Sequence, residues 1–123
     1  MDPIEHMVRL FYERAFEDPV LGPIFFDEIH DLEPHILRVA DFWSDHLRGT
    51  KKYEGKVYAV HMRLKFEPEA FDNWLRAFEG AANEALEAAD AAKAIRIARH
   101  MAGSFKVGLF PFTGKDGRPS RTP

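Results

Sequence analysis

Histidine and aromatic side chains are the residues of this 123-residue chain whose types and spacing point to shared chemistry. Imidazole is a good ligand for iron, and a planar apolar cofactor needs an aromatic lining. His61 ends the segment that begins at Tyr53. That segment lies between the pair Phe42-Trp43 and the downstream run Phe71-Asp72-Asn73-Trp74. This combination predicts a haem site with His61 as the candidate iron ligand.

A plainer interpretation of the same residues is a Phe-rich core. The chain has 11 Phe, 3 Tyr and 2 Trp, which is a large number of aromatic residues for its length. Taken singly, a histidine is more often structural or solvated than a metal ligand. The six histidines are His6, His30, His35, His46, His61 and His100. Composition alone therefore leaves both interpretations open.

Several kinds of chemistry are excluded by missing residues and motifs. The chain has no cysteine, which excludes disulfides, thiolate-ligated haem, iron–sulfur clusters and covalent haem attachment through cysteine. It also lacks the Glu-x-x-His pair of di-iron bundles, the His-Glu-x-x-His zinc helix and the Gly-x-Ser-x-Gly elbow of hydrolases. Ordinary hydrolase and nucleotide-binding functions are therefore not expected.

Charge and hydropathy point to neither nucleic acid nor a membrane as a partner. The formal net charge is −3 and the pI is about 6.1, whereas nucleic-acid-binding domains are basic. No apolar run approaches the roughly 20 residues of a membrane span, and the acidic start Met1-Asp2-Pro3 lacks a signal-peptide core. We expect a cytoplasmic protein.

Helical periodicity covers most of the chain, so we predict an all-α domain. The first helix follows the cap Asp2 and ends near Asp18-Pro19, with Tyr12 on its buried stripe. Residues 18–30 read as a compact connection. A second helix runs from the cap Asp31 to Gly49.

Beyond Gly49, residues 49–57 read as an exposed loop and residues 56–62 as a short helix that carries His61. Further helices open at Pro68 and at about Asp90. We find no strand pattern. The domain is expected to span residues 1–112, with residues 113–123 as a disordered tail.

Polar side chains on apolar helix faces suggest a ligand cavity. His35, Val39 and Phe42 lie on one face of the second helix, and Tyr12 and Trp74 lie on buried stripes of other helices. A buried tyrosine hydroxyl needs a hydrogen-bonding partner, which a bound ligand can supply.

Several short sequence motifs, in this order along the chain, resemble those of a known family. The chain resembles the group III truncated haemoglobins over residues 4–112. The matching motifs are Phe11-Tyr12-Glu13-Arg14, Asp18-Pro19-x-Leu21-Gly22-Pro23-Ile24-Phe25, His35 ahead of Phe42-Trp43, Gly49-Thr50 with Tyr53-x-Gly55, His61-x-x-Leu64 and Phe71-x-x-Trp74-Leu75.

The resemblance implies a two-over-two helical sandwich that holds haem b non-covalently. By position, His61 resembles the proximal iron ligand of the family, and Tyr12, His35 and Trp74 resemble its distal polar residues. Phe25 resembles the haem-packing phenylalanine and Val39 an apolar distal residue. The expected cofactor-binding residues are Phe25, Val39, Phe42, Trp43, Tyr53, Leu64, Phe71 and Trp74. Val57 and Lys65 stand where the family usually has proline.

The implied function is the binding of oxygen, carbon monoxide and nitric oxide at a ferrous iron. Tyr12 and Trp74 would donate hydrogen bonds to the bound ligand and slow its release, which favours redox or detoxification chemistry over oxygen delivery. His35 would be a further donor or a gate. We expect an unidentified reductase as partner, and a monomer or weak dimer. The alternatives are a gas or redox sensor acting through a partner protein, and a helical interaction module without cofactor.

Overall fold

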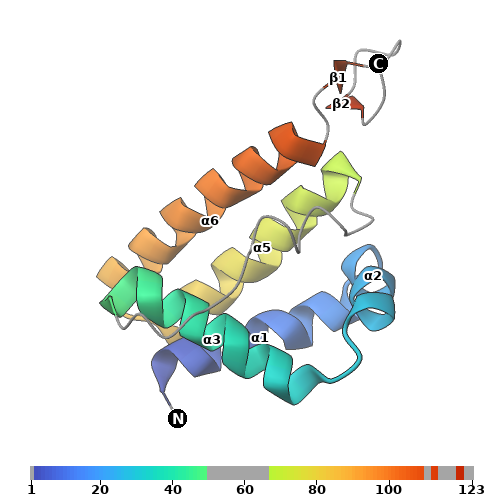
Figure 1. The fold of residues 1–123 in the computed structure, drawn as a ribbon. Helices are drawn as coiled ribbons and strands as arrows, with labels where there is room; N and C mark the ends of the chain where they lie inside the picture. The colour runs from blue at the N-terminus through green and yellow to red at the C-terminus, as the bar shows by residue number, and fades with distance from the viewer. Residues whose placement is uncertain (1, 50–66, 110–111, 114–118, 121–123) are drawn as a thin grey trace.

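Residues 2–49 and 67–109 form five helices, and two short strands lie at 112–113 and 119–120 (Figure 1). These ranges are the residues that the structure, a computed structural model, describes. The helices are α1 (Pro3–Glu17), α2 (Leu21–Glu28), α3 (Leu32–Arg48), α5 (Pro68–Ala85) and α6 (Ala88–Leu109). The predicted all-α class is confirmed.

Local sequence signals explain where α1 begins and which face it buries. The Asp2 carboxylate accepts a hydrogen bond of 2.7 Å from the backbone N–H of Ile4, and Pro3 occupies the first helical turn. Both features stabilise a helix start, because the first N–H groups have no partner within the helix. The buried residues then recur at helical spacing: Ile4, Met7, Val8, Phe11, Tyr12 and Ala15.

Helix α2 lies where the sequence predicted only a connection over residues 18–30. Pro19, Gly22 and Pro23 favour a connection, but Gly22 and Pro23 fall in the first turn of α2. Proline is tolerated there because its missing N–H would have had no helical partner. The Asp18 carboxylate accepts hydrogen bonds from the backbone N–H groups of Val20 and Leu21 at 2.8 and 3.0 Å. These contacts begin the helix that carries Phe25.

The bounds of the longer helices follow the predicted signals closely. Helix α3 ends at Arg48 and is capped by Gly49, whose φ of 67° is the left-handed conformation that glycine adopts without strain. Asp31 is the residue before α3, as predicted, although its side chain makes no capping hydrogen bond. Helix α5 opens with Pro68, and α6 begins at Ala88, two residues before the predicted start. Gly49 is the first residue of the loop predicted over residues 49–57. The rest of that loop and the short helix predicted over residues 56–62 lie outside the described residues.

The helices pack as two pairs laid one against the other. Helix α1 packs on α3 and α5 on α6, while α1 also contacts α5 and α3 contacts α6 (Figure 1). Helix α2 packs beside α1 and touches α5. Buried alanines let the helix axes come close: Ala70, Ala81 and Ala82 in α5, and Ala91, Ala94, Ala98 and Ala102 in α6. The predicted two-over-two arrangement is confirmed.

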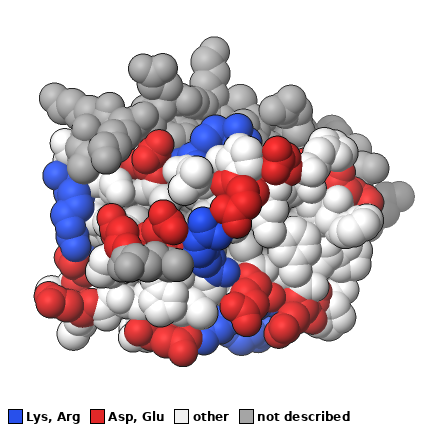
Figure 2. Space-filling model, turned by 90° about the horizontal axis from the view of Figure 1, so that it is seen from below, with Lys and Arg blue, Asp and Glu red and all other residues white. Residues whose placement is uncertain are grey.

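Each of these four helix contacts carries one ion pair at its rim. The pairs are Arg9–Glu33 between α1 and α3, Arg48–Asp90 between α3 and α6, Arg14–Glu84 between α1 and α5, and Glu79–Arg99 between α5 and α6. Figure 2 shows Lys and Arg lying among Asp and Glu on one face of the molecule. Such exposed pairs contribute only about 0–1 kcal/mol each to the free energy of unfolding. The helices are therefore held together mainly by the burial of apolar side chains, and the ion pairs help to orient them.

The C-terminal segment contains a small antiparallel pair of strands, β1 (Phe112–Thr113) and β2 (Pro119–Ser120). Phe112 is paired with Ser120 and Thr113 with Pro119. These strands were not predicted, because two residues are too few to show an alternating pattern. The other residues of the predicted disordered tail lie outside the described ranges. Within those ranges, no helix has the length and apolar content to cross a membrane.

Gly22 allows α2 to approach α1, and its substitution should be costly. A Cβ at this buried position would lie 2.6 Å from the backbone carbonyl oxygen of Phe16. Because a backbone atom cannot rotate away, α2 would have to shift. We expect Gly22→Ala to lower the free energy of unfolding by about 1–3 kcal/mol, measured by urea denaturation followed by circular dichroism.

Gly103→Ala is the matched control. Gly103 is exposed in α6, and a Cβ there has nothing within 4 Å. This variant should be unchanged or more stable by up to about 1 kcal/mol, because alanine favours helix over glycine. Equal stability of the two variants would contradict the close approach at Gly22.

Candidate functional site

A tyrosine and a histidine from different helices form a hydrogen bond in the interior. Tyr12 of α1 is buried and His35 of α3 is half-buried. The hydroxyl oxygen of Tyr12 lies 2.7 Å from Nε2 of His35, and the ring planes are inclined at 79°. Burial raises the pKa of Tyr12 well above its usual range, because desolvation disfavours the phenolate. Tyr12 is therefore a neutral phenol with one proton to donate.

Aromatic rings from three helices form one cluster that includes Tyr12. Phe11 makes edge-on contacts with Tyr12, Phe25, Trp74 and Phe78 at centroid distances of 4.9, 6.2, 5.9 and 6.1 Å. Tyr12 also lies 5.8 Å from Phe25. Edge-on packing stabilises aromatic pairs beyond the burial of their area. The ring of Tyr12 thus packs against an aromatic wall, which consists of Phe11 of α1, Phe25 of α2, and Trp74 and Phe78 of α5.

Trp74 belongs to the same wall from the side of α5. It is 9% exposed and stacks on Phe78 at 5.7 Å. The indole N–H of Trp74 is a hydrogen-bond donor and cannot act as an acceptor, so Trp74 can donate to a bound molecule.

The remaining candidate residues from the sequence divide into three groups. Val39 and Phe42 are half-buried on α3, and Phe71 is buried in α5. Trp43 is buried but stacks on Phe78 at 4.7 Å, which places it at the contact of α3 with α5. The residues Tyr53, His61 and Leu64, with Val57 and Lys65, lie outside the described residues. The role of each candidate toward a cofactor stays a prediction.

The other described histidines do not join this cluster. His6, His30, His46 and His100 are exposed. His46 contacts the ring of Phe42 at a centroid distance of 4.4 Å on the outer side of α3. Only His35 among the described histidines has a ring nitrogen bonded to a buried polar group.

An ion pair close to Tyr12 and His35 fixes α1 against α3. The Arg9 guanidinium donates two hydrogen bonds to the Glu33 carboxylate, at 2.8 and 2.9 Å, and a third to Glu5 at 3.0 Å. Arg9 precedes Tyr12 by three residues and Glu33 precedes His35 by two. A bidentate contact between a guanidinium and a carboxylate fixes the relative orientation of the two side chains as well as contributing to stability. Sequence reasoning missed it, because no local pattern links residues 24 positions apart.

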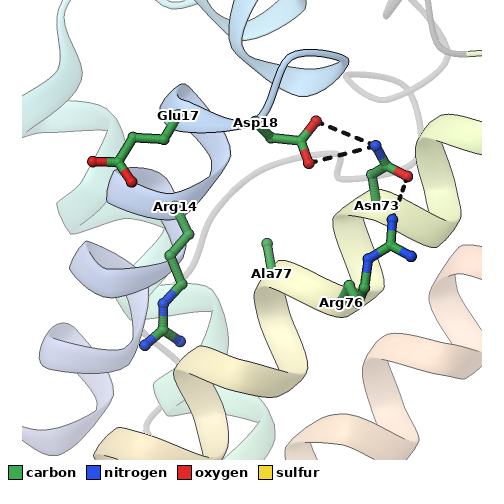
Figure 3. Close-up of a pocket in the computed structure, with 6 residues that line it drawn as sticks. All are labelled: Arg14, Glu17, Asp18, Asn73, Arg76 and Ala77. Atoms are coloured by element: carbon green, nitrogen blue, oxygen red, sulfur yellow. Dashed lines mark hydrogen bonds between the residues drawn. The ribbon is translucent and has the colours of Figure 1, made fainter.

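A second junction joins the corner between α1 and α2 to α5. The Asn73 side-chain amide donates to the Asp18 carboxylate at 3.2 and 3.4 Å, and its oxygen accepts from Arg76 at 2.7 Å (Figure 3). Arg14, Glu17 and Ala77 complete the lining of a surface pocket of about 340 Å³. Asn73 directly precedes Trp74, so this junction holds the α5 backbone next to the tryptophan. The sequence signal at this junction is Asp18-Pro19, which predicts only a helix end.

A family model described as bacterial-like globin matches residues 1–107. The chain belongs to the bacterial-like globin family. The group 3 truncated haemoglobin of Campylobacter jejuni is 28% identical over 118 residues, with 92% of this chain and 93% of that protein covered. The crystal structure of the group III truncated haemoglobin from Campylobacter jejuni is similar, with a TM-score of 0.85 at 28% identity, covering 92% of this chain and 93% of that one. The predicted resemblance and the truncated-globin fold are both confirmed.

Membership in the globin family implies a haem cofactor and the binding of diatomic gases such as oxygen. The described residues suit such a cofactor. Among them no charged side chain is buried, so the interior is apolar as a macrocycle requires. Tyr12, His35 and Trp74 supply hydrogen-bond donors of the kind that a gas ligand on haem iron can use.

Acid should weaken this globin partly through Asp18. Burial opposes ionisation of its carboxyl, but hydrogen bonds from the backbone of Leu21 and Val20 and from Asn73 outweigh burial and lower the pKa of Asp18. A group whose folded pKa is lowered adds stability above its unfolded pKa of about 3.8 and loses it as pH falls through the folded pKa. We expect Asp18→Asn to be less stable than wild type at pH 7, with the difference shrinking below about pH 4. Urea denaturation at several pH values measures it.

Asp72→Asn changes the charge equally at an exposed position of α5. It should unfold at the urea concentration of the wild type at pH 7. A difference between wild type and Asp18→Asn that stays constant from pH 7 to pH 2.5, or a stability of Asp18→Asn equal to wild type at pH 7, would contradict the assigned role of the Asp18 carboxylate.

Proposed function

We propose that this globin binds haem b non-covalently, with His61 as the protein ligand of the iron and with Tyr12, His35 and Trp74 facing the gas ligand on the opposite side. The absence of cysteine from the sequence supports non-covalent binding, because thioether attachment needs cysteine. When bound, the haem supplies an iron that holds oxygen, carbon monoxide or nitric oxide. Phe25, Val39, Phe42, Trp43, Tyr53, Leu64 and Phe71 are the residues proposed to pack against the cofactor.

The observation that carries the proposal is the neutral, buried hydroxyl of Tyr12, bonded to His35 and set in an aromatic wall. Tyr12 and Trp74 each hold one polar hydrogen to donate. A hydrogen bond to a ligand that carries partial negative charge contributes about 1.5–3 kcal/mol, or roughly a ten- to hundredfold slower release.

Two such donors favour slow oxygen release, and slow release suits chemistry on the ligand better than oxygen delivery. We therefore propose redox or detoxification chemistry on oxygen, nitric oxide or peroxide. This chemistry consumes electrons, so a reductase is the partner that it requires. The side chains of Tyr12 and Trp74 would hold and polarise the ligand, while the aromatic wall would exclude water.

His61→Ala should abolish stable haem retention, because it removes the only protein ligand that the proposal gives to the iron. The ratio of Soret to protein absorbance in the purified protein measures haem content. His46→Ala and His100→Ala are matched controls at exposed positions and should keep their haem. A His61→Ala protein with a normal five-coordinate ferrous spectrum would contradict the assignment.

Tyr12→Phe should leave the fold intact and speed oxygen dissociation by about tenfold, the size of one charge-assisted hydrogen bond. Only the hydroxyl is removed, so the aromatic packing on Phe11 and Phe25 should survive. Stopped-flow displacement measures the rate, and circular dichroism checks the fold. An unchanged rate with an unchanged carbon monoxide stretching frequency would mean that Tyr12 does not face the ligand.

A further inference from the structure

The corner between α1 and α2 carries an aromatic side chain that the interior does not use. Phe26 is 76% exposed, the largest exposed fraction of any large hydrophobic residue in the described ranges. It lines an open surface groove of about 470 Å³ together with Phe16, Pro19 and Pro23. The other lining residues are Gly22, Glu17, Asp18 and Asp27. An exposed apolar patch bordered by charged residues is typical of a surface that binds another protein.

The charges around this groove have one sign. Residues 15–37 contain none of the 17 Lys and Arg of the chain and six of its 20 Asp and Glu. Among the described residues, neither Glu17 nor Asp27 takes part in an ion pair. Arg14, one turn before Glu17, pairs with Glu84 of α5, and its guanidinium lies apart from the Glu17 carboxylate (Figure 3). A cation from another protein can therefore pair with these two carboxylates.

We propose that this groove docks the reductase that the proposed function requires, through a basic segment of the reductase that inserts one large apolar side chain beside Phe26. The inference rests on the proposed function, because the chemistry on the gas ligand is what consumes electrons. Lysine or arginine side chains of the segment pair with Glu17 and Asp27. Opposite charges speed the encounter of two proteins and set their orientation.

Phe16 links the groove to the proposed haem site. Its ring lies 6.5 Å from that of Tyr12 and 6.3 Å from that of Phe25. Because Phe25 is proposed to pack against the cofactor, one side chain separates a partner in the groove from a residue at the haem. Redox encounters between proteins bury little surface, and opposite charges speed their association. A small acidic groove beside Phe25 therefore suits an electron donor better than a permanent subunit.

Two other occupants fit the charge of the groove less well. A symmetric dimer through this face would bring Glu17 and Asp27 of one copy close to the same carboxylates of the other, and like charges across an interface repel. An anionic membrane surface would be repelled for the same reason. A basic protein segment is the occupant that the acidic border favours.

A peptide titration of the haem-loaded ferrous carbon monoxide complex tests the docking. The probe is a synthetic peptide in which lysines flank a leucine and a tryptophan, and the matched peptide has glutamates in place of the lysines. We expect saturable ¹H–¹⁵N shift changes confined to residues that line the groove, and binding about tenfold tighter for the lysine peptide. Equal affinities of the two peptides, or shift changes spread over other faces, would overturn the inference.

Variants of the groove separate the apolar contact from the charges. Phe26→Ser should weaken the lysine peptide about tenfold. Glu17→Gln combined with Asp27→Asn should weaken it about fivefold, a loss that shrinks as salt is added. The controls are Val107→Ser, at an apolar residue of α6 that is 71% exposed, and Glu87→Gln, at an exposed residue between α5 and α6. Both controls should bind as wild type does, and wild-type affinity in Phe26→Ser would overturn the inference.

The role of the partner as electron donor is tested with the same peptides carrying a flavin at one end. The reduced flavin loses one electron and the ferric iron of the haem-loaded protein gains it, which stopped-flow absorbance follows. Below saturation, we expect reduction about tenfold faster with the lysine peptide than with the glutamate peptide. This advantage should be lost in Phe26→Ser. Equal rates with the two peptides on the wild-type protein would overturn the inference.

Failure of the proposed function would give a different result from failure of the docking. A purified protein without haem would contradict the proposed function, whereas titration of the haem-free protein would still show whether the groove binds a basic segment. Sedimentation velocity tests the remaining occupant. A wild-type dimer that Phe26→Ser dissociates would identify a second copy of the chain on this surface and overturn the inference.

Discussion

The ring of Phe11 lies where α1, α2 and α5 meet, and the rest of the interior is arranged around it. Its edge-on contacts reach Phe25 in α2 and Trp74 and Phe78 in α5. Because these contacts fix the rotation of α1, the next residue, Tyr12, is directed toward α3, where His35 meets it. An apolar packing constraint therefore determines where the buried hydroxyl of this chain lies.

Residues that stabilise the contacts between helices lie close in the sequence to residues proposed to bind cofactor or ligand. Asn73 holds α5 to the corner between α1 and α2, and the next residue is Trp74. Gly22 lets α2 come against α1, and three residues later Phe25 packs on Tyr12. Residues that shape the helix contacts are thus adjacent in sequence to residues proposed to touch cofactor or ligand. Substitutions at the contacts should alter ligand behaviour as well as stability.

Much of the fold followed from local signals. The cap at Asp2, the glycine after α3 and Pro68 at the start of α5 each mark a helix end with a definite physical cause. The start of α2 was missed because Asp18-Pro19 and Gly22-Pro23 favour turns as well as helix starts. The two-over-two packing came from resemblance, since periodicity shows which face of a helix is buried and does not show which helix covers it.

The site was predictable to a smaller extent. The burial of Tyr12 and Trp74 was predicted from the apolar helix faces on which they lie. The position of His35 near a ligand cavity was predicted from the apolar face of its helix. The hydrogen bond between Tyr12 and His35 spans 23 positions, and the Arg9–Glu33 and Asp18–Asn73 contacts are also long-range. Such contacts depend on how helices are placed in space, which a single sequence does not encode locally. The part assigned to His61 remains a prediction.

We propose that His61 holds the iron of the haem and that the Tyr12–His35 pair faces the gas ligand. A crystal structure of the haem-loaded ferric protein with cyanide tests it most directly, because cyanide is a diatomic ligand that occupies the open position. We expect iron bound to His61 and the Tyr12 hydroxyl in contact with both cyanide and His35. Iron bound to another histidine, or a Tyr12 hydroxyl turned away from the cyanide, would contradict it.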